Sequence, residues 1–298
     1  MGFPEYACEY SRRLAAKSRR FALQVYDPKG AGAADVCESG SYSQDPFGEL
    51  ASASKIKGVK QRFPDRVLVM TTDKCFMNCR HCTRQWLFGR TETVETQDDL
   101  NRCVEYVRAR PKVRDVLLSG GDAMTLSDGA LMRFVDAFAA LPQVDVVRVC
   151  TRALCTNPSR VTAKIARMLG RSKKVWVNTQ FNCSDEVTAE ARAAAARLVD
   201  AGVPVSCQTV LLRGVNDSSA EMLRLLRALT AARIRPYYVF MCDPVAGIDR
   251  FRVPLEKAVA IERKCEESIG GLSMPRFVMD VPGAKSKMPI SRIYSKER

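Results

Sequence analysis

The sequence predicts an α/β protein built as a partial (β/α)6-type TIM barrel with an N-terminal helical extension. Two observations carry this prediction. From residue 67 onward, short apolar runs alternate with amphipathic helical patterns at a spacing of roughly 30 residues, as in repeated βαβ units. No G-x-G-x-x-G phosphate turn follows these runs, which disfavours a dinucleotide-binding sheet. We expect an N-terminal helix and wrapping arm over residues 1–60 and the barrel over residues 61–298.

The apolar runs are the predicted strands. They are short, rich in β-branched residues and apolar nearly throughout, which is typical of parallel strands covered on both faces. The runs lie at 67–72, 113–119, 144–150, 174–179, 204–212, 236–241 and 276–281. Between them, apolar residues recur three and four positions apart, and this period predicts helices, for example over 97–109, 185–202 and 218–233.

The N-terminal region differs from the barrel in composition. Residues 8–26 predict a basic amphipathic helix that packs on the barrel with its charges in solvent, in preference to a helix that binds a nucleic acid or a membrane. Residues 28–55 are rich in Gly, Ala, Ser and Asp, and predict a loop or wrapping arm.

Composition limits the classes of function. The 298 residues are 46% apolar and 27% charged, which excludes disordered and fibrous classes. No window approaches about 18 uninterrupted apolar residues and the start lacks an apolar signal core, so we expect a cytoplasmic protein without a membrane span. A net charge of +14 fits an anionic ligand or partner. The single histidine, His81, excludes metal sites built on several imidazoles, whereas twelve cysteines favour metal or cofactor duty at some of them.

Polar or reactive residues follow each predicted strand. Chemistry in a barrel of parallel strands is expected at these C-terminal strand ends. In chain order they are Cys75, Cys79 and Cys82; Ser119, Gly120, Gly121 and Asp122; Cys150, Thr151 and Arg152; Asn178, Thr179 and Gln180; Gln208; Asp243; and Asp280 with Lys287.

The three cysteines form the strongest motif. Cys75, Cys79 and Cys82 can hold three corners of a cubane iron–sulfur cluster and leave the fourth iron without a protein ligand. A zinc site and three ordinary buried cysteines are the alternatives. The C-x3-C-x2-C spacing resembles that of the radical S-adenosylmethionine (SAM) enzymes. That resemblance implies a 4Fe-4S cluster whose open iron chelates the amino and carboxylate groups of SAM.

The segment after the second predicted strand fits the same interpretation. Gly120 and Gly121 would allow the backbone to approach the methionine end of SAM, and Ser119 and Asp122 complete the motif. Taken alone, the segment would be a helix N-cap that follows a strand.

Several further segments resemble the lysine 2,3-aminomutase family over about residues 45–298. They are RFPDRVL (62–68), CRHCTRQ (79–85), LLSGGDAM (117–124), VLLRGVND (210–217), RPYYVFMCD (235–243) and DVPGAKSKMP (280–289). The resemblance implies pyridoxal 5′-phosphate (PLP) as a further cofactor, with Lys287 as the lysine that forms its Schiff base and Lys285 as the neighbour that competes for this assignment. A lysine suits this role because its amine can lose a proton, which an arginine cannot.

The resemblance also implies roles for the remaining site residues. Arg62 and Arg66 correspond to ligands of the PLP phosphate, and Arg84 to the arginine that holds the substrate carboxylate. Asp243 and Asp280 correspond to the acids that bind the side-chain ammonium of lysine. Two carboxylates suit a basic substrate and would repel a glutamate side chain. By the same resemblance Gln208 contacts SAM and His81 lies beside the cluster.

The chain departs from the family pattern at several positions. Phe63 and Phe240 stand where the family has tyrosine, Gln180 where it has histidine, and Ser218 where it has a zinc-site cysteine. The short C-terminal region resembles the branch that modifies a lysine of translation elongation factor P, although Thr83 and Asp280 do not fit that branch.

The expected function is that of an isomerase, a SAM- and PLP-dependent 2,3-aminomutase acting on L-lysine or a close basic amino acid. One alternative is an aminomutase acting on a protein-borne lysine of the elongation factor P type, which would make an acidic protein the partner. Another is a family member without turnover. The expected partners are a small-molecule amino acid and a reductant such as flavodoxin or ferredoxin, and a nucleic acid is not expected.

Overall fold

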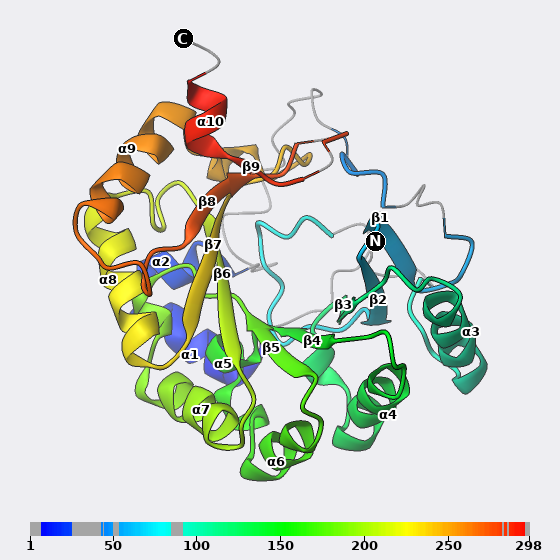
Figure 1. The fold of residues 1–298 in the computed structure, drawn as a ribbon. Helices are drawn as coiled ribbons and strands as arrows, with labels where there is room; N and C mark the ends of the chain where they lie inside the picture. Colours follow the sequence, from blue (N-terminus) through cyan, green and yellow to red (C-terminus); the bar gives the residue numbers. More distant parts are fainter. Residues whose placement is uncertain are drawn as a thin grey trace.

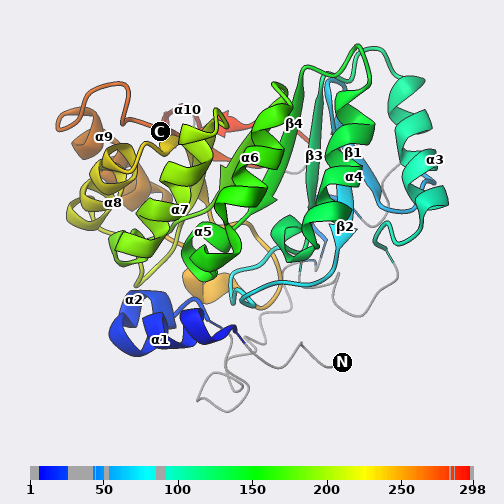
Figure 2. The same ribbon diagram turned by 90° about the horizontal axis from the view of Figure 1, so that it is seen from below.

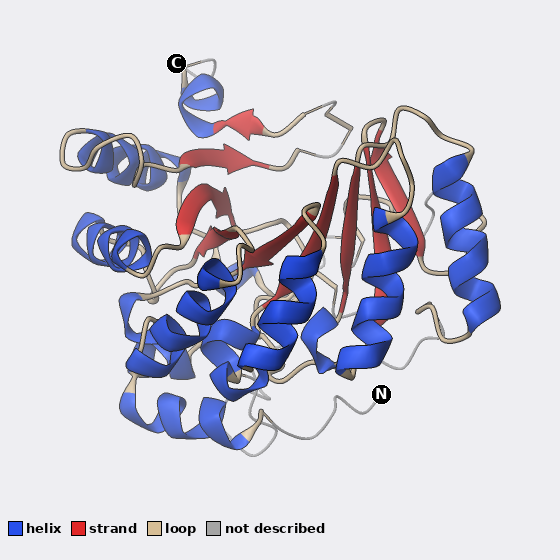
Figure 3. Ribbon diagram, turned by 60° about the horizontal axis from the view of Figure 1, so that its bottom comes forward, coloured by secondary structure: helices blue, strands red, loops and turns tan. Residues whose placement is uncertain are grey.

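One curved sheet organises the molecule. The computed structural model describes residues 7–25, 43, 45–49, 54–84, 92–281, 283–284 and 286–295. Within this part of the chain, nine strands form one open sheet in which each strand pairs with the next in sequence. Figure 1 shows the sheet curling around a central space with helices outside it, and Figure 3 shows the helices covering the outer face. The predicted partial barrel is confirmed.

The strands from β2 to β8 are parallel, and only the two outermost pairs are antiparallel. The nine strands are β1 (Val59–Phe63), β2 (Arg66–Thr72), β3 (Asp115–Gly120), β4 (Val146–Thr151), β5 (Val175–Thr179), β6 (Val205–Leu211), β7 (Arg235–Met241), β8 (Arg276–Met279) and β9 (Met288–Pro289). Each of the seven predicted runs contains or overlaps one of β2 to β8. The edge strands β1 and β9 were missed because β1 carries alternating charges and β9 has two residues, so neither forms an apolar run.

The helices follow the strands in the order that βαβ units require. They are α3 (Gln97–Arg108), α4 (Asp128–Ala139), α5 (Ala153–Thr156), α6 (Ala163–Arg171), α7 (Ala189–Asp200), α8 (Ser219–Ala231), α9 (Leu255–Glu266) and α10 (Ile290–Tyr294), with single 3₁₀ turns at Ala123–Thr125, Pro158–Arg160, Ser184–Glu186 and Asp249–Phe251. A serine or threonine side chain caps five of the long helices by accepting a hydrogen bond from the first turn: Thr96, Ser127, Thr162, Thr188 and Ser218. These caps give each helix a defined start after a loop.

The N-terminal region forms two helices, so the prediction of one helix over 8–26 is wrong. Ser18 separates α1 (Glu9–Lys17) from α2 (Arg19–Ala22). Its hydroxyl caps α2 by accepting from Phe21 N and donates to Asp185 at 2.6 Å. A serine side chain can hydrogen-bond to nearby backbone groups in this way, and this bonding competes with continuation of the helix. Residue 26, at the end of the predicted helix, lies outside the described residues.

The helix pair packs against the cysteine loop at the C-terminal ends of the strands. Figure 2 shows α1 and α2 against one end of the barrel. Phe21 is fully buried beside Met77, Cys8 N donates to Phe76 O at 2.8 Å, and Arg80 N donates to Gln24 O at 2.9 Å. The expected packing of this region on the barrel is thereby confirmed.

Two other predictions from the sequence stay untested. Much of the predicted arm at 28–55 lies outside the residues that the structure describes, although residues 45–49 lie within them. The division of the chain at residue 60 stays a prediction, and β1 spans that position. No helix within the described ranges is long and apolar enough to cross a membrane.

Candidate active site

A cavity of about 370 Å³ opens at the C-terminal ends of the parallel strands. Its lining comes from β1 and β2, from the C-terminal ends of β3 to β7 and the segment after β8, from the cysteine loop and from residues 45–49. All the predicted site residues line it: Arg62, Arg66, Cys75, Cys79, His81, Cys82, Arg84, Ser119, Gly120, Gly121, Asp122, Gln208, Asp243, Asp280 and Lys287. The fold therefore brings together residues that are more than 200 positions apart in the chain, such as Arg62 and Lys287. Lys285 lies outside the described residues.

The cysteine loop follows β2 directly. Its three cysteines have free thiols, and the loop is fixed by Cys82 N donating to Cys79 O at 3.1 Å and by a backbone bridge between Cys79 and Val25. Burial raises the pKa of Cys82 to about 11 and the pKa of Cys75 well above its ordinary value. A metal site here must therefore release protons as it forms.

The three thiols suit an iron–sulfur cluster. Cys75, Cys79 and Cys82 lie on one short loop and line the cavity, and Cys82 N donates to Cys79 O. A single zinc needs all its sulfurs within about 2.3 Å of one point, whereas a cubane cluster gives each cysteine a separate iron. The donor set of three thiols beside a polar cavity therefore fits an iron–sulfur cluster.

Gly120 and Gly121 serve close packing against the start of the cysteine loop. Gly120 has a φ of 107°, and a Cβ there would lie 2.4 Å from Thr72 O. A Cβ on Gly121 would lie 2.3 Å from Lys74 O, and Gly121 N donates to Thr72 O at 2.6 Å. These contacts would force any larger residue to move the backbone. The glycines thus join the ends of β2 and β3, and approach to SAM at this point stays a prediction.

Asp122 is buried and fully engaged by the protein. Its carboxylate accepts from Met124 N at 2.9 Å, Thr151 Oγ1 at 2.6 Å and Arg152 N at 2.8 Å. It therefore caps the turn Ala123–Thr125, as the alternative interpretation of this motif expected, and it ties the end of β3 to the end of β4. Direct contact of Asp122 with a cofactor stays a prediction.

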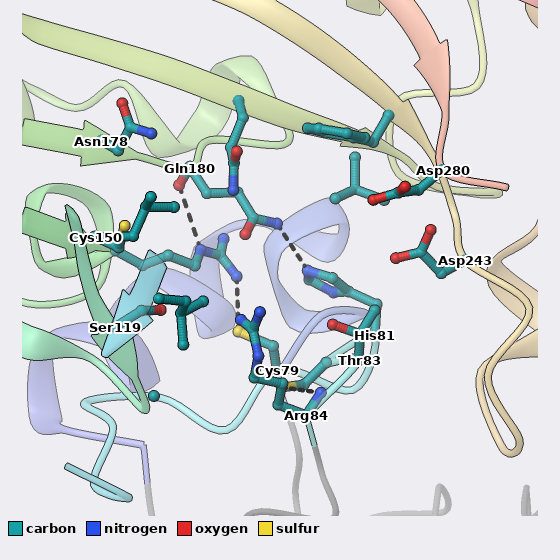
Figure 4. A pocket seen from close by; sticks show the side chains of 18 of the residues that line it. Cys79, His81, Thr83, Arg84, Ser119, Cys150, Asn178, Gln180, Asp243 and Asp280 are labelled. Carbon is teal, nitrogen blue, oxygen red and sulfur yellow. Dashed lines mark hydrogen bonds between the residues drawn. The ribbon is translucent and has the colours of Figure 1, made fainter. Parts of the chain in front are cut away.

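His81 is neutral and held by amides. Burial lowers its pKa to about 3. Its Nε2 lies 3.1 Å from Gln180 Nε2 and 3.3 Å from Asn182 Nδ2. Because amide nitrogens donate, Nε2 accepts and Nδ1 carries the hydrogen. Figure 4 shows His81 and Gln180 joined in this way. Gln180, which departs from the family pattern, thus positions the imidazole.

Lys287 lies at the other end of the cavity. Its Nζ donates to Asp280 Oδ2 at 3.0 Å and lies 4.5 Å from the centre of the Phe240 ring. Arg62 donates two hydrogen bonds to the same carboxylate, at 3.0 and 3.3 Å. Phe63 lies beside both cations, with its ring centre 5.9 Å from Lys287 Nζ and 5.5 Å from Arg62 Cζ. Asp280 therefore balances two positive charges, those of Lys287 and Arg62.

Asp243 and Asp280 face the same part of the cavity (Figure 4). Burial and the nearby Asp280 carboxylate raise the pKa of Asp243 to about 7, against the opposite effects of Lys287, Arg62 and Arg84. The two carboxylates therefore lie close enough to repel each other. A cation placed between them would relieve that repulsion.

Arg84 is paired with Glu49, a residue that the sequence did not single out. Glu49 accepts from Arg84 Nε and Nη2, both at 2.8 Å. This pair uses one edge of the planar guanidinium group. Because an arginine has five N–H groups, those on the Nη1 edge can still donate to a second carboxylate. Phe47 of the same segment stacks on Arg62 with 4.4 Å between Cζ and the ring centre.

The remaining predicted residues, Gln208 and Arg66, form contacts with neighbouring side chains. Gln208 Oε1 accepts from Tyr237 Oη at 3.0 Å, and Tyr237 Oη accepts from Asn178 Nδ2 at 2.8 Å. Arg66 pairs with Asp65 at 3.0 Å and stacks on Phe63. Their side chains reach the cavity, and the proposed contacts with SAM and with a phosphate remain predictions.

An open α/β barrel with three cysteines after its first parallel strand defines the class of the protein. Residues 69–226 match the Radical SAM superfamily, so the chain is a member of that superfamily. It is similar in fold to Streptococcus suis SuiB bound to precursor peptide SuiA, with a TM-score of 0.57, 13% identity and coverage of 80% of this chain and 52% of that one. A radical SAM methyltransferase from Sphaerobacter thermophilus gives a TM-score of 0.54 at 19% identity, over 76% and 69% of the two chains.

Curated relatives define the family more narrowly. The chain is 40% identical over 260 residues to L-lysine 2,3-aminomutase of Fusobacterium nucleatum, which covers 87% of this chain and 61% of that protein. It is 33% identical over 290 residues to a putative L-lysine 2,3-aminomutase of Treponema pallidum, over 96% and 79% of the two chains. A glutamate 2,3-aminomutase of Clostridioides difficile is 33% identical over 250 residues, over 84% and 59% of the two chains.

The chain belongs to the lysine 2,3-aminomutase family. It spans 60% to 63% of the length of the first three curated relatives that it matches. Membership implies the cofactors expected from the sequence, namely a 4Fe-4S cluster, SAM and PLP.

Proposed function

We propose that this protein is a radical SAM, PLP-dependent 2,3-aminomutase that moves the α-amino group of L-lysine, or of a close basic amino acid, to the β carbon. The supporting observation is that Lys287 and the three cysteines line one cavity of about 370 Å³. An amine suited to hold PLP and thiols suited to hold a cluster thereby share one reaction space, although they come from distant parts of the chain.

Cys75, Cys79 and Cys82 would hold the cluster, and Lys287 would hold PLP. When bound, the cluster with SAM supplies a radical that removes a hydrogen atom, and PLP stabilises the migrating nitrogen. Among the protein's own groups, Asp122 joins the ends of β3 and β4 by hydrogen bonds from Met124 N, Thr151 Oγ1 and Arg152 N, and Gln180 after β5 donates to His81 beside the cysteines. They would keep the reaction space rigid and exclude water from it.

Asp280 would change partners during the reaction. It pairs with Lys287 at 3.0 Å and with Arg62 at 3.0 Å. If the Lys287 nitrogen holds PLP, Asp280 would lose one of these two partners, and its carboxylate would bind the side-chain ammonium of the substrate together with Asp243. The protein would thus keep its carboxylates compensated before and after ligand binding, which avoids an unpaired buried charge.

The opposite end of the substrate would be bound by Arg84. Its Nη1 edge can donate hydrogen bonds to the α-carboxylate while Glu49 accepts from the other edge. Arg62 and Arg66, which stack near Phe63, would hold the PLP phosphate. This arrangement requires a basic side chain, because the glutamate side chain would meet Asp243 and Asp280.

The test is turnover by the anaerobically reconstituted holoenzyme. Incubation with L-lysine, SAM, PLP and a one-electron reductant should yield β-lysine, detected by chromatography and mass spectrometry. L-glutamate should give no β-glutamate under the same conditions. An enzyme that retains its cluster and its PLP absorbance but forms no β-amino acid from lysine, arginine or ornithine would refute the proposal.

A further inference from the structure

Arg152, at the end of β4, is a buried arginine with no role in the function proposed so far. Its side chain is 10% exposed. Nη1 donates to Cys79 Sγ at 2.9 Å, and Nη2 donates to Gln24 Oε1 and to Glu186 Oε2, both at 3.2 Å. Nε donates to Gln180 O at 3.3 Å. Four of its five N–H groups are therefore engaged by the protein, which fixes the direction of the fifth.

Glu186 holds Arg152 in this position. The Glu186 side chain is fully buried, and it also accepts from Gln24 Nε2 at 2.7 Å, Asn182 N at 3.1 Å and Cys183 Sγ at 3.5 Å. Rotation of Arg152 away from Cys79 would leave the buried Glu186 carboxylate uncompensated in the interior, which is unfavourable. The contact between the guanidinium and the Cys79 sulfur is therefore enforced by the surrounding structure.

We propose that Arg152 is a positioning residue that donates a hydrogen bond to the Cys79 sulfur and raises the reduction potential of the cluster, and that Glu186 moderates this effect through its opposite charge. The inference rests on the proposed function only in taking Cys79 as a cluster ligand. One-electron reduction adds a negative charge to the cluster. An N–H···S bond and a nearby positive charge stabilise that reduced state, so they raise the potential.

The proposal differs from a purely structural role in a measurable way. A residue that merely ties α2, the Ser184–Glu186 turn and β5 together would change stability when replaced but would leave the potential of a loaded cluster unchanged. A residue that acts through charge and hydrogen bonding predicts shifts of opposite sign when Arg152 and Glu186 are neutralised separately.

The experiment is an anaerobic redox titration of the reconstituted protein without SAM, followed by electron paramagnetic resonance of the reduced cluster. Arg152→Gln should shift the midpoint to a more negative potential, and Glu186→Gln should shift it to a more positive one. Arg160→Gln is the matched control, because Arg160 is a partly buried arginine paired with Asp128 that does not line the cavity. Its midpoint should equal that of the unmodified protein.

Iron and sulfide content would be measured for every variant. Should Arg152→Gln take up no cluster, Arg152→Lys and Glu186→Gln carry the test, with a smaller negative shift expected for the lysine, which keeps the charge. Loaded Arg152 and Glu186 variants with unchanged midpoints, or with shifts of the same sign, would overturn the inference. Unmodified protein that binds no cluster would instead refute the proposed function.

Discussion

The two ends of the cavity are stabilised differently. Around Cys79 and Arg152 the side chains are buried, and the Arg152–Glu186 pair is closed by bonds to Gln24 and Asn182. Around Lys287 the charged groups are partly open: Arg62 and Lys287 are 24% and 21% exposed, and both pair with Asp280. At the first end the charges of Arg152 and Glu186 are compensated by each other within the protein, whereas the second end holds charges whose partners a ligand can exchange.

This difference suits the chemistry proposed for each end. A cluster that changes its charge by one electron benefits from fixed dipoles that need not reorganise. An amino acid that enters and leaves needs charged partners that are compensated in its absence, because an unpaired buried charge is costly. Variants at the Lys287 end should therefore alter ligand affinity and turnover, and variants at the Cys79 end should alter stability and potential.

The largest expected effect is the loss of turnover in Lys287→Ala. We expect turnover of lysine to fall by at least about a thousandfold, since the amine proposed to hold PLP would act as a unit with the cofactor. Cluster content should stay unchanged, because Lys287 lies at the opposite end of the cavity. Lys264→Ala, which removes an exposed lysine paired with Glu267, is the control and should keep full activity. If Lys287→Ala kept turnover within tenfold of that of the unmodified enzyme, the role proposed for the Lys287 end of the cavity would be wrong.

Lysine binding should depend on pH through Asp243. Burial and Asp280 raise its pKa to about 7, against Lys287 and Arg84, so the carboxyl is protonated below that pH. An ammonium ligand prefers the carboxylate and must displace this proton. Affinity for L-lysine should therefore fall by up to about tenfold for each pH unit below 7 and level off above it.

The pH profile would be measured by equilibrium binding of L-lysine to the holoenzyme between pH 5.5 and 8.5, values chosen to bracket the pKa of about 7. Asp243→Asn should bind more weakly at pH 8 and lose this dependence. A profile that is equally steep in Asp243→Asn would assign the proton to another group.

At the Cys79 end, Gln24→Ala should reduce stability without changing lysine affinity. The Gln24 amide accepts from Arg152 and Asn182 and donates to Glu186. Its removal leaves these buried groups short of partners, at a cost of about 1–3 kcal/mol in the free energy of unfolding. Thermal and denaturant unfolding of the reconstituted protein would measure it. A Gln24→Ala protein of normal stability but with weakened lysine binding would contradict the division between the two ends.

The smallest expected effect is that of Glu49→Gln. Loss of the charged pair should loosen Arg84 and weaken L-lysine binding about three- to tenfold, the equivalent of about one ordinary hydrogen bond. Binding of L-lysinamide, which lacks the carboxylate, should change less. The ratio of the two dissociation constants is therefore the readout. Tighter L-lysine binding in Glu49→Gln would show that Glu49 competes with the substrate instead of positioning Arg84.

The sequence was informative wherever a local pattern carries the chemistry. The spacing of Cys75, Cys79 and Cys82 needs no tertiary information, and the apolar runs predicted seven of the strands because parallel strands are buried on both faces. Once those strands were predicted, the rule that barrels place chemistry at strand ends selected Asp243, and the cavity contains it.

Residues whose role depends on a distant partner could not be predicted in this way. Glu49 lies in a segment without periodicity, and only the fold brings it to Arg84. Arg152 was noted at a strand end, but its bond to Cys79 and its burial with Glu186 depend on how α2 and β5 pack. Ser18 likewise ends a helix although the amphipathic pattern continues past it. Its hydroxyl accepts from Phe21 N and donates to Asp185, and both partners depend on the fold.

The most direct measurement of the central claim is the site at which PLP is attached while the cluster is present. Borohydride reduction of the anaerobic holoenzyme, followed by proteolysis and mass spectrometry, should locate the pyridoxyl group on Lys287 in protein that retains its iron and sulfide. A pyridoxyl group found on another lysine, such as the neighbouring Lys285, or only in protein that has lost its cluster, would contradict it.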